Sequence, residues 1–184
     1  MALRVKSHWH DEDRERSIDE IGSALAINAW KLAKDKAVNL HGEDFVYETD
    51  EQRMAVIAEY LIFQVQVVDR MAHEGLSEGE RRALITAMAL ALARQVQSNS
   101  EDIFGPGDYG RPFIERLNGR AADYAELNFT EEGPSYPFMR LLGYEIQQIM
   151  GKGDQNRWVI DQVMDSDAPE IFKKLARAFT DLFE

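Results

Sequence analysis

Five polar residues in one otherwise apolar stretch have the types and spacing that acid–base chemistry or carboxylate binding requires. On a helix, Glu59, Gln66, Arg70 and His73 follow at steps of seven, four and three residues, so they share one narrow stripe, with Asp69 beside it. Converging in a cleft, such side chains could move protons or bind a small ligand. The same stripe is typical of the one hydrated face of a buried helix, or of a buried polar network that fixes helix packing. We expect one of these two structural roles and assign no catalytic residue, because no nucleophile or cofactor motif accompanies the stripe.

A second candidate lies near the start of the chain, where His8 and His10 stand one residue apart and Asp11 follows. In an extended segment, residues two apart point to the same side, so these side chains are candidate metal ligands. Zinc or iron would need further ligands from elsewhere, and the paired Glu-x-x-His motifs of ferritin-like di-iron bundles are absent from the sequence. We therefore expect residues 1–16 to be a polar, extended lead-in to the first helix, and we predict no cofactor.

Composition limits the classes of partner. The absence of cysteine excludes disulfides, thiolate metal sites and cysteine nucleophiles. The net charge of −12 argues against nucleic acid and anionic membranes as partners, since most of the surface would repel them. The most apolar segments are interrupted by charged residues or too short to be membrane spans. Arg4 and Lys6 are followed by no apolar segment, so we predict no secretory signal and expect a cytoplasmic protein.

Helical periodicity governs nearly the whole sequence and predicts one all-α domain, residues 1–184, with six or seven helices. Three capping boxes predict helix starts, and glycines or prolines mark other boundaries. The expected helices cover about 17–41, 50–74, 78–98, 112–128 and 137–151, followed by a short helix around 158–163 and a last one from Pro169. The segments 50–74 and 78–98 are apolar nearly all round, so we expect them to form a central antiparallel hairpin.

The segment Gly105–Gly110 reads GPGDYG and has the glycine spacing of dinucleotide-binding loops. Those loops follow a strand, whereas a helix is predicted before this one, and Asp108 would repel a phosphate. We therefore interpret the segment as a turn.

The motifs identify no protein family and no reaction. We expect a non-enzymatic helical protein that acts through contacts with a protein partner or with itself. The alternative is a small-molecule-binding or metal-binding bundle, an enzyme included, that uses the stripe of Glu59 to His73 or the His8–His10 segment. The last helix adds Phe172, Phe179 and Phe183 to an apolar face, which is broad for a terminal surface helix. We therefore predict a homodimer with the last helix as one candidate contact.

Overall fold

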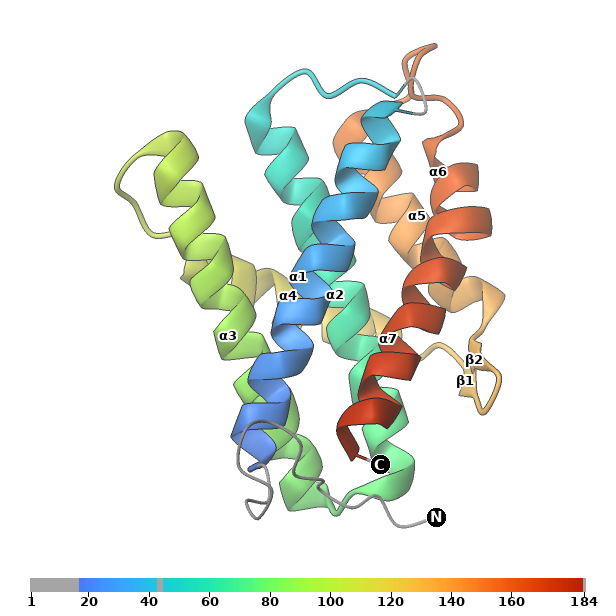
Figure 1. Cartoon of the computed structure of the whole chain (residues 1–184). Helices are drawn as coiled ribbons and strands as arrows, with labels where there is room; N and C mark the ends of the chain where they lie inside the picture. Colours follow the sequence, from blue (N-terminus) through green and yellow to red (C-terminus); the bar gives the residue numbers. More distant parts are fainter. Residues whose placement is uncertain (1–16, 43–44, 184) are drawn as a thin grey trace.

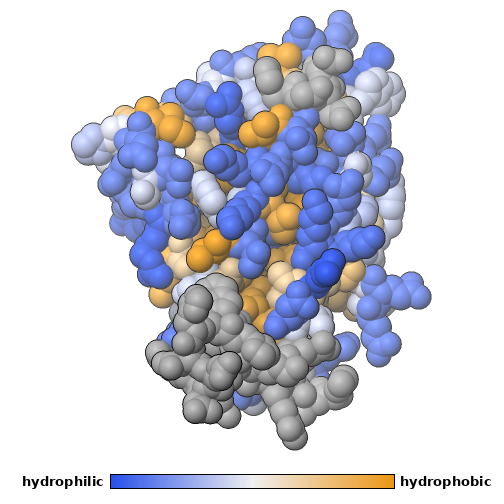
Figure 2. Space-filling view, in the orientation of Figure 1, coloured by the Kyte–Doolittle hydropathy of each residue, from blue (hydrophilic) through white to orange (hydrophobic). Residues whose placement is uncertain are grey.

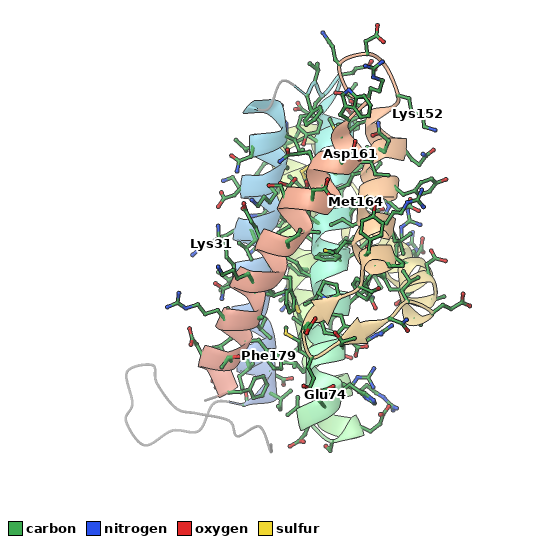
Figure 3. All side chains as sticks on the ribbon, turned by 90° about the vertical axis from the view of Figure 1, so that its right-hand side faces the viewer. Lys31, Glu74, Lys152, Asp161, Met164 and Phe179 are labelled. Carbon is green, nitrogen blue, oxygen red and sulfur yellow. The ribbon has the colours of Figure 1, made fainter. Side chains whose placement is uncertain are left out.

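The computed structural model describes residues 17–42 and 45–183, and helices form nearly all of this part of the chain (Figure 1). The elements in chain order are α1 (Ile18–Gly42), α2 (Asp50–Gly75), α3 (Glu78–Phe104), α4 (Gly110–Ala125), β1 (Phe129–Thr130), β2 (Gly133–Pro134), α5 (Tyr136–Met150), α6 (Val159–Gln162), the π-helical turn η1 (Val163–Asp167) and α7 (Ala168–Phe183). The two short strands pair antiparallel. The predicted all-α bundle is confirmed, since α6, η1 and α7 run on without a break and leave six helical rods in the described chain (Figure 3).

Local capping explains where most of these helices begin. The capping box at the start of α3 is complete: the Ser77 hydroxyl accepts from the N–H of Glu80, whose carboxylate accepts from the N–H of Ser77. The box at positions 17 and 20 is formed in the same way. At α2 only half of the predicted box exists. Thr49 Oγ1 accepts from the N–H of Gln52 at 3.1 Å, but the Gln52 side chain accepts from the N–H of Glu48 instead.

The boundary between α3 and α4 differs from the prediction. α3 continues past position 98 to Phe104, because the polar residues there do not break a helix. It ends at Gly105, whose φ of +86° is accessible to glycine and strained for other residues. α4 then begins at Gly110 and ends at Ala125, a few residues before its expected end. The segment GPGDYG is thus mainly a connection between two helices, as predicted.

The last two expected helices are one helix with a widened turn. We predicted that Pro169 would open a separate helix, but α7 already begins at Ala168 and continues directly from η1. Proline donates no N–H, and its ring crowds the carbonyl four residues earlier, here that of Asp165. Asp165 lies inside η1. The π-helical turn therefore occurs at the position where Pro169 would obstruct a regular α-helix.

The core is built around α2. Every residue of α2 from Val56 to Val68 is buried, and the apolar ones belong to a core to which all the longer helices contribute. α1, α5 and α7 pack beside α2, while α4 crosses behind it (Figure 1). The predicted hairpin is present, but only α2 is central. α3 lies at the edge and buries one face, with Leu84, Met88 and Leu92.

One face of the molecule is mostly polar. In the view of Figure 2, hydrophilic side chains predominate and apolar ones appear as separate patches between them. No helix in the described residues is long and apolar enough to cross a membrane.

The expectation that the last helix has surplus apolar surface is wrong. Phe179 and Phe183 are buried, and their rings pack against each other with centroids 4.8 Å apart. Phe172 is half-buried and contacts Phe129 beside the small strand pair. Figure 3 shows Phe179 near the C-terminal end of α7. Its aromatic residues are therefore occupied within the chain and are not available as a broad dimer contact.

Alanine substitution at two glycines within helices should change the free energy of unfolding in opposite directions. A Cβ at Gly22 would lie 2.7 Å from the Cβ of Ala87 and 3.0 Å from the backbone oxygen of Leu84, so α1 and α3 would have to separate. Gly22→Ala should lower the free energy of unfolding by about 1–3 kcal/mol. A Cβ at Gly119 in α4 would meet nothing within 4 Å, and Gly119→Ala should raise it by about 0.5–1 kcal/mol. Urea unfolding of both variants measures these changes. Equal changes in the free energy of unfolding would contradict the close packing of α1 on α3.

Candidate functional site

Glu59 lies at the centre of a polar cluster inside the bundle. Its side chain, on α2, is fully buried, and its two carboxylate oxygens accept hydrogen bonds from Arg120 of α4 at 3.1 and 3.2 Å. The same guanidinium donates to Glu145 of α5 at 2.5 Å. We call Glu59, Arg120 and Glu145 the central ion cluster. One half-buried cation thus joins three helices through two carboxylates.

Burial also governs the titration of this cluster. It raises the pKa of the Glu145 carboxyl, and Arg120 opposes that shift by favouring the charged form. Burial likewise raises the pKa of the Tyr124 hydroxyl, one turn after Arg120 on α4, so Tyr124 stays neutral at physiological pH. The Tyr124 hydroxyl has no hydrogen-bond partner among the described residues. The cluster contains no serine, threonine or lysine, and its contacts are those of an ion pair between one guanidinium and two carboxylates.

A second cluster lies where η1 meets α7. Asp167 is buried and accepts a hydrogen bond of 2.6 Å from the Tyr60 hydroxyl of α2 and one of 3.3 Å from the Gln162 amide. Lys36 of α1, also buried, lies 4.0 Å from Asp167 and forms an ion pair with Glu170 of α7. We call these five residues the π-turn cluster. Burial raises the pKa of Asp167, and the hydrogen bond from Tyr60 acts in the opposite direction.

The π-turn cluster was missed by the sequence analysis, although one signal was present. Lys36 falls among Ala29, Ala33, Ala37 and Leu40 on the apolar side of α1, where a charged side chain requires a partner. That partner, Glu170, lies 134 residues away, so no local pattern connects the two. The π-turn itself also has no sequence motif beyond Pro169.

The predicted stripe is divided among different neighbours and does not converge. Asp69 forms a bidentate ion pair with Arg81 at 2.8 Å, and Arg81 also contacts Nδ1 of the exposed His73 at 3.0 Å. These contacts join the two arms of the α2–α3 hairpin. Gln66 is buried. The residues of the stripe therefore make separate polar contacts with different helices and do not form one site.

Arg70 binds backbone carbonyls at the C-terminal end of α4. Its guanidinium donates to the carbonyls of Tyr124 and Leu127 at 2.7 and 2.9 Å and lies over the ring of Phe138. The Tyr124 carbonyl also accepts the backbone N–H of Leu127, so Arg70 adds a second donor there and supplies a donor to the Leu127 carbonyl just past the end of α4. It also places a positive charge at the negative end of the helix dipole. Its observed contacts are structural.

The predicted metal ligands His8, His10 and Asp11 lie outside the described residues. Within residues 17–42 and 45–183, no group of three or more histidine, aspartate or glutamate side chains is arranged to hold a metal ion. The metal hypothesis thus has no support from the part of the chain with assigned positions.

The outer side of the seam between α1 and α3 has two hollows and two exposed aliphatic side chains. Two adjoining hollows of about 640 and 290 Å³ follow it and share Ser23 and Arg94. Leu90 borders the larger hollow and is 50% exposed; Ile27 borders the smaller and is 46% exposed. The floor of the larger hollow is made of small residues, among them Gly79, Ala83 and Ala87. We call this surface the α1–α3 face.

The α1–α3 face explains why α3 is apolar nearly all round. One side of α3 supplies Leu84, Met88 and Leu92 to the core, as an amphipathic helix does. The other side carries the exposed Leu90 and Ala83, beside the half-buried Ala87 and Ala91. Uncovered apolar residues grouped on one surface are typical of contact sites.

No protein-family model, curated protein or solved structure shows a significant match to the chain.

Proposed function

We propose that the protein acts through protein–protein contact and that the α1–α3 face joins it to a second copy of itself. The observation that supports this proposal is the exposure of Leu90 and Ile27 over hollows lined by small residues. Complete burial of an exposed leucine or isoleucine contributes about 1.5–3 kcal/mol, and Leu90 and Ile27, which are already half-buried, would each contribute about half of that. The ionic clusters inside the bundle then serve to hold α2, and with it the face, in one arrangement.

A second copy suits this face because a two-fold interface pairs a surface with itself. Such a surface needs both protrusions and hollows. Leu90 and Ile27 supply the larger side chains, and the alanines of the larger hollow leave space for them. The charges are also mixed: Asp19 lies at the start of α1, and Arg94 lies farther along the seam. A two-fold axis across the helices exchanges the two ends and brings Asp19 of one copy toward Arg94 of the other.

The charge of the whole chain favours this choice of surface. At −12, two copies repel each other over most of their area. The charged residues that line the larger hollow are Asp19, Arg82 and Arg94, so this surface has no excess of acids. Association through this surface therefore brings few acids of the two copies together.

Sedimentation equilibrium tests the proposal at micromolar protein concentrations. The parent chain should form a dimer, and Leu90→Glu should weaken dimerisation at least about tenfold, because it buries a charge at the centre of the face. Ile103→Glu is the matched control: Ile103 is 48% exposed on the same helix but borders neither hollow. A parent chain that stays monomeric, or a Leu90→Glu dimer as tight as the parent dimer, would refute the proposal.

A further inference from the structure

A separate cleft lies where the end of α3 and the start of α4 meet the beginning of α2. Its volume is about 410 Å³, within the range of small-molecule sites in proteins. Apolar side chains dominate the lining, chiefly Met54, Ala55, Val96, Phe104, Tyr109 and Phe113. Phe104 and Tyr109 pack against each other with ring centroids 6.0 Å apart. The cleft shares no residue with either hollow of the α1–α3 face.

Two polar residues of this cleft have side-chain donors that bind no described residue. Ser100 is only 3% exposed, yet its hydroxyl makes no hydrogen bond to any described residue. A serine buried in a helix ordinarily finds a partner, so this hydroxyl is available to a group inside the cleft. Arg116 also lines the cleft and is exposed, and its guanidinium forms no ion pair with a described residue.

The other charged groups at the cleft do not occupy Arg116. Asp108 is paired with Arg111, at 3.1 Å, and also accepts the backbone N–H of that residue. Glu51 is exposed in the first turn of α2 and forms no ion pair with Arg116. Arg116 is the one cation among the residues that line the cleft, where Glu51 and Asp108 are the two acids.

We propose that this cleft binds an amphipathic organic anion, specifically a carboxylate on an apolar chain or ring of small-molecule size. The apolar body lies against Met54, Phe104 and Phe113, and the carboxylate accepts hydrogen bonds from Arg116. A guanidinium and a carboxylate have matching planar geometry, which favours the anion over a neutral or cationic head group. The Ser100 hydroxyl provides a further polar contact within the cleft. This site is independent of the self-association proposed above.

Isothermal titration calorimetry with decanoate, below its micelle concentration, tests this proposal. Decanoate should bind with one site per chain. Decanol and decylamine, which have the same chain with neutral and cationic head groups, should bind at least tenfold more weakly. Arg116→Gln should weaken decanoate binding at least tenfold, and Ala55→Phe, which fills the cleft from half-buried Ala55, should abolish it.

The controls separate a specific site from general binding to apolar surface. Arg140→Gln removes another exposed arginine, one that does not line the cleft, and should leave binding unchanged. Ser98→Ala should be neutral, whereas Ser100→Ala should weaken binding several-fold. Circular dichroism and thermal unfolding show whether each variant is folded. Undetectable decanoate binding, equal binding of decylamine, or parent-like binding by folded Arg116→Gln would each overturn the proposal.

Discussion

Arg120→Leu should lower the free energy of unfolding by about 3–5 kcal/mol, the largest effect of any single substitution considered for this protein. Arg120 is the one cation shared by Glu59 and Glu145 in the central ion cluster. Its removal leaves the fully buried Glu59 carboxylate without its partner, together with a second carboxylate close by. A buried, unpaired charge costs far more than a buried pair contributes.

Arg116→Leu is the matched control for this result. It lies about one turn before Arg120 on α4, is exposed, and pairs with no described carboxylate. Its effect on unfolding should stay within about 0.5 kcal/mol. Urea unfolding at neutral pH compares the two. Similar small effects for both variants would show that the Glu59 carboxylate reaches water or another cation, contrary to the geometry described.

The second large effect concerns the π-turn cluster. Tyr60→Phe should lower the free energy of unfolding by about 1.5–3 kcal/mol, because it removes a 2.6 Å hydrogen bond to the buried Asp167 carboxylate. Tyr47→Phe makes the same chemical change where the hydroxyl donates to the neutral carbonyl of Ala37, at 2.8 Å. The free energy of unfolding of Tyr47→Phe should therefore fall by only about 0.5–1.5 kcal/mol. Thermal and denaturant unfolding measure both, and an equal or larger loss for Tyr47→Phe would argue that Asp167 is not held as a buried anion.

Features that depend on neighbouring residues were predictable from the sequence. The helix start at Ser77 follows from a serine and a glutamate three positions later, and the end at Gly151 follows from a residue that tolerates a φ of +79°. The all-α class follows from periodicity over many turns. These features require no knowledge of what lies across the core, which is why local patterns identify them.

The partners of the buried polar groups were not predictable in this way. The stripe on α2 includes Glu59, but the cation that Glu59 binds is 61 residues away on another helix. Arg70 and Asp69, adjacent in sequence, turn to α4 and α3 respectively. Periodicity shows which side chains share a face and not which helix covers that face. The same limit explains why α3, apolar nearly all round, was expected at the centre and lies at the edge.

The most direct test of the proposed self-association is the reactivity of a single thiol on the α1–α3 face. The natural chain has no cysteine, so Thr86→Cys, at an exposed position that lines the larger hollow, introduces the only thiol. Its rate of alkylation by a maleimide should fall at least fivefold as the protein concentration rises through the dimerisation range, whereas Thr180→Cys on the exposed side of α7 should react at a constant rate. Protection of Thr86→Cys alone is the result we predict. A dimer in which Thr86→Cys remains as reactive as in the monomer would contradict the assignment of the α1–α3 face as the contact.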